Sequence, residues 1–174
     1  EVEQRSSQWA RYLMALGAGP GETVCVDLPV GIDLVIAAWA VVKSGAALAV
    51  GSSEAARWVL TTTDRDVHGS GRRLAMDAPD LVSEVSGLSA RTIAYTERTA
   101  VPSPGDAGIR FPGTALSQGR AVALLRNGIV GKELTYDARI LVAGPDADRW
   151  VLHAVLAAAL AGAVVVMADN ASDV

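Results

Sequence analysis

The stretch from residue 23 to residue 50 restricts the fold more than any other part of the sequence. Two short apolar stretches, TVCVDL (23–28) and AALAV (46–50), flank IDLVIAAWAVVK (32–43), which is apolar nearly all round. This pattern predicts a strand, a buried helix and a second strand. A strand–helix–strand unit with short loops places its strands parallel, with a right-handed crossover. We therefore expect an α/β protein.

The rest of the chain extends this arrangement. A helix is expected over 3–16, ending at Gly17, and others near 77–86 and over 146–161. Strands are expected at 58–62, 91–95 and 163–167, with apolar segments at 107–111 and 139–144. The stretches 39–50 and 156–167 share the order apolar helix, Gly-Ala, apolar strand, which two similar lobes would produce. We expect a first α/β lobe over 1–97, a Pro/Gly/Ser connection over 98–106 and a second α/β lobe over 107–174, in one compact unit.

Composition supports parallel sheets flanked by helices and narrows the possible partners. Hydrophobic residues make up 51% of the chain but aromatic residues only 5%, so Ala, Val, Leu and Gly must form the core. The net charge of −4 and the lack of a basic run argue against nucleic acid as a partner. Cys25 is the only cysteine, which excludes an internal disulfide and a thiolate metal cluster and fits a cytoplasmic protein.

The uncharged segment 151–168 is long enough to span a bilayer. However, its composition changes at Gly162 from Ala/Leu to β-branched Val. This change favours a buried helix followed by a buried strand. We therefore expect no membrane association.

Residues 115–119 have the pattern A-x-S-x-G, which resembles the nucleophile elbow of α/β-hydrolases, with Ser117 as the serine. The aspartates Asp137, Asp146 and Asp148 and then His153 follow in the matching chain order. Against this, an elbow serine follows its strand directly, whereas PGTAL intervenes here. His153 also lies in an apolar helix pattern that is typical of a core histidine. A serine hydrolase is kept as a remote alternative.

The stretch LGAGPGETVCVDLPVGIDLVIAAWAVVKSGAALAV (16–50) closely resembles the opening of the adenylation domains of nonribosomal peptide synthetases, members of the adenylate-forming (AMP-binding) superfamily. PGDAGIRFPGTALSQGRAVALLRN (104–127) takes the place of the family's phosphate-binding loop, and LAAALAGAVVVMAD (156–169) that of a later helix and strand. The resemblance covers nearly the whole chain in the family's order. It implies the N-terminal portion of an adenylation-domain core.

The departures from the family pattern concern its chemistry. The family's loop has a Ser/Thr/Gly run followed by a lysine. Here the loop has no lysine, and Ala115 and Leu116 stand where a hydroxyl and a glycine are expected. The small, hydroxyl and cationic residues that remain in this loop are Gly113, Thr114, Ser117, Gly119 and Arg120. We interpret these residues as a degenerate, non-functional remnant, so that no cofactor is expected; ATP with Mg²⁺ would bind only if the loop still worked.

The family's substrate-binding aspartate, which holds the ammonium group of an amino acid, falls near Asp148 and Arg149. In one register Arg149 takes this place and would repel the ammonium group; a shift of one residue gives the place to Asp148. The family's nucleotide contacts, hinge and C-terminal lobe with its catalytic lysine have no counterpart up to Val174. The resemblance thus implies no catalytic residues and no enzyme activity for this chain.

We therefore predict a non-catalytic pseudo-adenylation domain with a structural or protein-interaction role in a nonribosomal peptide synthetase-like assembly line. Its expected partner is a neighbouring condensation or carrier domain, or a second copy of itself. The alternative is one half of a split adenylate-forming enzyme, or a nucleotide-binding module.

Overall fold

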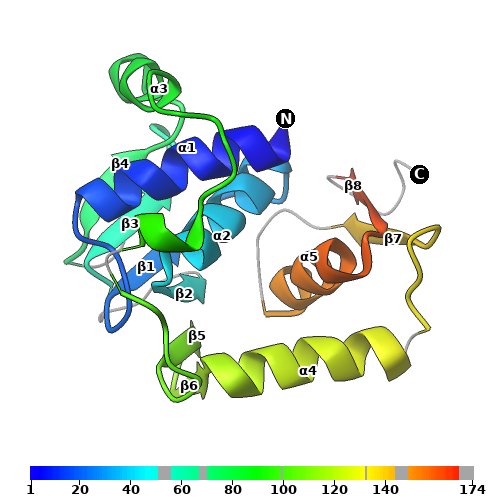
Figure 1. Cartoon of the computed structure of the whole chain (residues 1–174). Coiled ribbons are helices and arrows are strands. Elements are labelled where there is room, and N and C mark those ends of the chain that lie inside the picture. Colours follow the sequence, from blue (N-terminus) through cyan, green and yellow to red (C-terminus); the bar gives the residue numbers. More distant parts are fainter. Residues whose placement is uncertain (51–55, 67–69, 99, 132, 144–148, 169–174) are drawn as a thin grey trace.

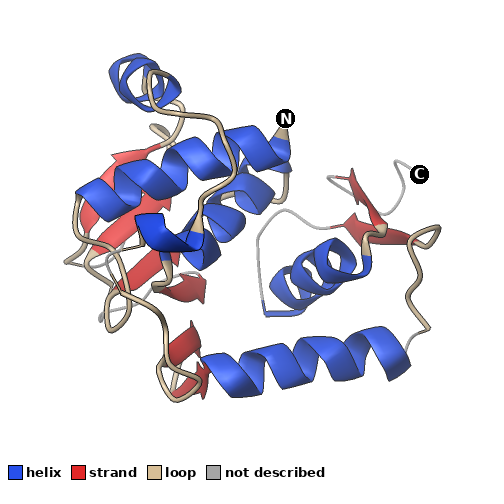
Figure 2. Ribbon diagram, viewed as in Figure 1, coloured by secondary structure: helices blue, strands red, loops and turns tan. Residues whose placement is uncertain are grey.

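The computed structural model describes residues 1–50, 56–66, 70–98, 100–131, 133–143 and 149–168 (Figure 1). Six strands form the larger sheet in the order β4-β3-β1-β2-β5-β6. Their bounds are β1 Thr23–Val26, β2 Ala47–Val50, β3 Trp58–Thr61, β4 Arg72–Ala75, β5 Ala107–Phe111 and β6 Thr114–Ser117. All neighbouring strands are parallel except β5 and β6, which are antiparallel. A mostly parallel sheet flanked by helices confirms the predicted fold class (Figure 2).

The predicted strand–helix–strand unit is present at the centre of this sheet. Helix α2 (Ile32–Ser44) connects β1 to β2, and the two strands pair in parallel from Thr23 with Ala47 to Val26 with Val50. Helix α1 (Val2–Ala15) packs against α2. Large side chains from these elements are almost fully buried: Trp9, Leu13, Val24, Leu34, Ile36, Leu48. The apolar helix is therefore part of the core, as its sequence predicts.

A second unit of the same kind lies near the C-terminal end of the described chain. Strand β7 (Arg139–Ala143), helix α5 (Arg149–Ala161) and strand β8 (Val164–Ala168) form it, and β7 and β8 are parallel. Gly45 after α2 and Gly162 after α5 have φ values of 85° and 71°, the left-handed conformation with which helices often end. The two similar sequence stretches thus form similar structures (Figure 1).

The stretch 151–168 is a helix followed by a strand, as predicted, but the strand is not buried. Val164 is 50% exposed, because this sheet has only two strands in the described part of the chain. Within the described residues, no helix is both long and apolar enough to cross a membrane.

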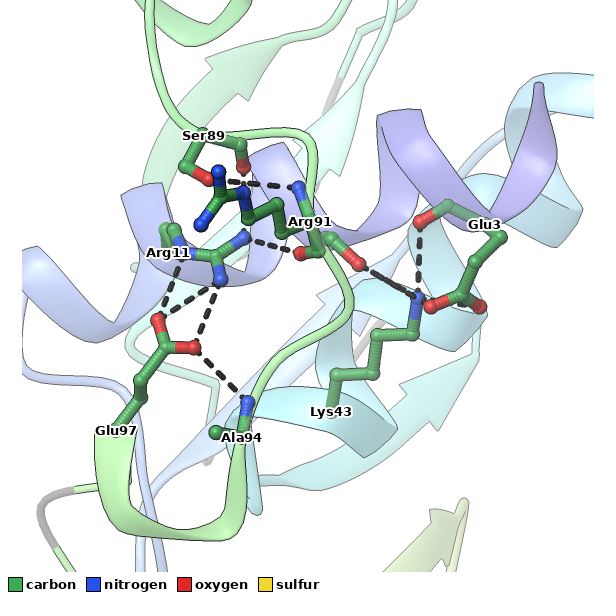
Figure 3. A network of polar contacts seen from close by, with 8 residues as sticks. Glu3, Arg11, Lys43, Ser89, Arg91, Ala94 and Glu97 are labelled. Carbon is green, nitrogen blue, oxygen red and sulfur yellow. Dashed lines mark hydrogen bonds and ion pairs between the residues drawn. The ribbon is translucent and has the colours of Figure 1, made fainter.

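Two predictions for the middle of the chain were wrong or incomplete. Residues 91–95 form no strand; a short 3₁₀ helix, η1 (Tyr95–Glu97), follows an irregular segment. The side chain of Arg11 explains this, since it donates hydrogen bonds to the backbone oxygens of Ser89 and Arg91 and binds the carboxylate of Glu97 (Figure 3). The segment is therefore held by α1 instead of a neighbouring strand. Strand β4 was not predicted, because Leu74 is its only buried residue.

The remaining helices are α3 (Pro79–Ser86), close to the predicted 77–86, and α4 (Gln118–Gly131). Strands β5 and β6 follow the 98–106 connection and yet belong to the six-stranded sheet. The larger sheet therefore contains strands from both sides of this connection. The division into a lobe over 1–97 and a lobe over 107–174 stays a prediction.

Candidate functional site

The stretch FPGTALSQGR (111–120), which the resemblance aligns with a phosphate-binding loop, forms a hairpin and the start of a helix. Strand β5 ends at Phe111, Pro112 and Gly113 make the turn, and Thr114 pairs with Phe111 as β6 begins. Gly113 has a φ of 75°, which a glycine adopts without strain. The region between the strands is therefore a two-residue turn, with Gly113 and Thr114 exposed at its tip.

The first backbone N–H groups of α4 already have acceptors within the chain. Gln118 donates to the oxygen of Asp106 at 2.7 Å, and Gly119 donates to the oxygen of Pro104 at 2.9 Å. The N–H of Arg120 donates to the hydroxyl oxygen of Ser117 at 3.3 Å. Anions bind at helix N-termini through N–H groups of this kind. At α4 these groups are bonded to the 104–106 segment and to Ser117 instead.

Ser117 is the last residue of β6 and directly precedes α4. The objection that PGTAL separates this serine from its strand was therefore wrong, because residues 114–116 are themselves in the strand. The Ser117 hydroxyl has the position and the hydrogen bond of a helix N-cap. His153, the histidine of the hydrolase alternative, lines an apolar cavity. Ser117 is not among the described residues that line this cavity.

The lysine in the described part of the chain, Lys43, is held by α1 (Figure 3). Its ammonium nitrogen lies 2.8 Å from Oε2 of Glu3 and donates to the hydroxyl oxygens of Ser6 and Ser7 at 2.8 Å and 2.9 Å. Partial burial by itself would raise the pKa of Glu3, but the hydrogen bond and charge of Lys43, together with hydrogen bonds from Thr92 and Ser7, lower this pKa below its ordinary value. Lys43 thus connects α1 to α2. The other lysine, Lys132, lies outside the described residues.

The structure does not describe the side chains of the two expected substrate-binding residues. Asp148, like Asp146, lies outside the described residues, and Arg149 is the first residue of α5, with a side chain that is not described. The alternative registers for a substrate-binding aspartate therefore stay predictions. No group of His, Cys, Asp and Glu in the described part of the chain could hold a metal ion.

An apolar cavity of about 300 Å³ lies between the β5–β6 hairpin, α4 and α5. Helices α4 and α5 lie next to each other at this point (Figure 1). The lining residues are Ile109, Phe111, Leu116, Ala121, Leu124, Leu125, Trp150, Leu152 and His153. Trp150 is 66% and Leu124 47% exposed, so these two side chains mark the opening to solvent.

The imidazole of His153 lines this cavity and lies close to Gly128 of α4. A Cβ atom at position 128 would lie 2.6 Å from Cε1 of the His153 ring, so the close approach requires glycine. His153 also borders a second hollow, of about 370 Å³, on the side of β7. No local sequence pattern predicts either hollow, because the walls come from segments that are far apart in the chain.

No family model and no curated protein matches the sequence. Solved structures do match. The chain aligns over 98% of its length with 20% of the nonribosomal peptide synthetase FmoA3, with a TM-score of 0.77 and 20% identity. A Mycobacterium tuberculosis fatty acyl CoA synthetase matches 97% of the chain with 38% of its own length, with a TM-score of 0.75 and 14% identity. NpsA-ThdA, an artificially fused adenylation-PCP di-domain from Klebsiella oxytoca, matches 97% of the chain with 34% of its own length. The TM-score is 0.73 and the identity 19%.

The chain thus has the fold of part of an adenylate-forming domain, as the resemblance implied. It spans between one fifth and about two fifths of the length of these three proteins. At such low sequence identities, the structural similarity shows the fold alone. Function has to be inferred from the residues.

Proposed function

We propose that the chain is a non-catalytic pseudo-adenylation domain with a structural or protein-interaction role in an assembly line of the nonribosomal peptide synthetase kind. The observation that carries the proposal is the two-residue turn at Pro112 and Gly113. A phosphate loop needs unbonded backbone N–H groups that converge on the ligand. Here antiparallel pairing occupies the strands on both sides of the turn, and acceptors within the chain occupy the start of α4.

The lack of a lysine near the turn supports the same proposal. Phosphate binding in such loops also uses a positive side chain. The sequence has no lysine between Lys43 and Lys132, and Lys43 is bound to Glu3 and two serines of α1. The cations nearest to the turn in the sequence are arginines, Arg110 in β5 and Arg120 in α4. Without a loop and a lysine, ATP would have little to bind.

Exposed apolar side chains support an interaction role. Leu124 and Trp150 border the cavity described above, and most of the other large ones that are exposed in the described residues lie between positions 122 and 164: Val122, Val130, Tyr136, Leu141, Leu160, Val164. Parallel sheets normally have both faces covered, and β7 and β8 pair only with each other in the described part. Exposed apolar surface of this kind is typical of protein-binding sites. We infer that a condensation domain, a carrier domain or a second copy of the chain covers it.

Pyrophosphate exchange tests the non-catalytic part of the proposal. The purified chain should show no amino-acid-dependent exchange between pyrophosphate and ATP, alone or mixed with a separately produced C-terminal portion of an adenylation domain. An intact adenylation domain serves as the positive control. Exchange that appears on mixing would contradict the proposal and favour one half of a split enzyme.

Sedimentation tests the interaction part. The mass should increase with protein concentration, or on addition of a condensation or carrier domain, because apolar surface is then buried. A chain that stays monomeric under all of these conditions would contradict an interaction role.

A further inference from the structure

We propose that the cavity between the β5–β6 hairpin, α4 and α5 binds an uncharged two-ring aromatic molecule with one hydrogen-bonding group, which pairs with His153. This ligand site goes beyond the interaction role proposed above and does not depend on it. The inference uses the size and the lining of the cavity and the imidazole of His153.

Size sets the number of rings. A dry apolar cavity of about 150 Å³ in another protein takes up benzene. The present cavity has about twice that volume, about 300 Å³, which is also at the lower end of the range for small-molecule sites. A fused two-ring molecule therefore fits better than a single ring or a drug-sized compound.

The lining sets the chemical class. No Asp, Glu, Lys or Arg is among the residues that line the cavity. An ionised ligand would lose its hydration there without gaining a partner of opposite charge, which is costly. Phe111 and Trp150 offer aromatic rings, which prefer edge-to-face or offset contact with a ligand ring. The preferred ligand is therefore aromatic and uncharged.

The imidazole of His153 supplies a polar contact. The His153 ring takes part in none of the hydrogen bonds among the described residues. Gly128 allows α4 to approach this ring closely. A neutral imidazole can donate one hydrogen bond and accept another. It can therefore pair with a hydroxyl or a ring N–H of the ligand, which fixes how the rings enter the cavity.

Calorimetric titration with 2-naphthol tests the proposal, with 2-naphthoate as the charged comparison of similar size. We expect saturable binding of 2-naphthol and weaker binding of 2-naphthoate. Ala121→Phe places a ring in the cavity and should abolish binding. Ala123→Phe is the matched control, because Ala123 is exposed on the same helix and does not line the cavity, and it should bind as the unchanged chain does.

His153→Phe keeps the apolar lining but removes the hydrogen bond, so 2-naphthol should bind about fivefold more weakly. Circular dichroism establishes whether each variant is folded. If Ala121→Phe does not fold, the His153→Phe variant and the comparison with 2-naphthoate still decide the question. The proposal is overturned if 2-naphthol shows no saturable binding at millimolar concentration, if 2-naphthoate binds equally well or better, or if either cavity variant binds like the unchanged chain.

Discussion

Replacement of Ser117 tests whether its hydroxyl caps a helix or belongs to a chemical site. In the structure this hydroxyl oxygen accepts a hydrogen bond from the N–H of Arg120 in the first turn of α4. Loss of an N-cap hydroxyl typically costs about 1 kcal/mol. The 3.3 Å distance is long for such a bond. We therefore expect Ser117→Ala to lower the free energy of unfolding by about 0.5–1 kcal/mol.

Ser117→Asp distinguishes a cap from a nucleophile. A carboxylate at this position still accepts the N–H of Arg120 and also interacts favourably with the positive end of the helix dipole. Its stability should equal or exceed that of the unchanged chain, whereas a nucleophile would be lost in both variants. Urea unfolding followed by far-UV circular dichroism measures the difference. In thermal unfolding, the alanine variant should melt about 1–4 °C lower.

Ser86→Ala provides the control for the loss of a serine hydroxyl. The Ser86 hydroxyl donates to a backbone oxygen within α3 and caps no helix start, so its removal should have little effect. The capping role of Ser117 is refuted if Ser117→Ala leaves the stability unchanged, or if Ser117→Asp is destabilised as much as Ser117→Ala. Loss of an esterase activity in both variants would revive the hydrolase alternative.

Two further predictions concern contacts between distant segments. The N–H of Ala94 and the guanidinium of Arg11 hold the pKa of Glu97 below its ordinary value. Glu97→Gln should therefore destabilise the chain above about pH 4.3, where the carboxylate is ionised in both the folded and the unfolded chain. The destabilisation should fade as the pH drops through the lowered pKa. Equal urea midpoint differences at neutral and acidic pH would contradict this. Gly128→Ala should not stabilise the unchanged chain, because the new Cβ would meet the His153 ring. In a His153→Ala background it should stabilise by about 0.5–1 kcal/mol through helix propensity, and an equal gain in both backgrounds would contradict the close contact.

The central strand–helix–strand unit could be predicted from sequence because its apolar pattern matches its burial. Strands β1 and β2 are buried on both faces, and most of α2 is buried as well. Strand β4 lacked such a pattern, because Arg72 and Arg73 are exposed and only Leu74 is buried. An edge strand of this kind has no clear apolar signal.

The errors had physical causes that local sequence does not contain. RTIAY (91–95) has the residue types of a strand, but Arg11 binds the backbone oxygens of Ser89 and Arg91, about eighty positions away in the chain. For the hairpin, a signal was present: Pro112-Gly113 between two β-prone stretches is a typical turn.

The cavity was beyond prediction from sequence for a different reason. Its walls come from Phe111 in the hairpin, Ala121 in α4, His153 in α5 and their neighbours, which only the packing of these elements brings together. The Gly128–His153 contact is equally non-local.

Titration of Mg-ATP into the purified chain, followed by calorimetry, tests the non-catalytic proposal most directly. An intact adenylation domain, titrated under the same conditions, shows what a working phosphate loop produces. We predict no saturable heat up to millimolar nucleotide, because hydrogen bonds within the chain occupy the first N–H groups of α4, the kind of group that a phosphate loop uses. Saturable binding that disappears in Arg120→Ala would contradict this account and would show that the 111–120 region still holds phosphate.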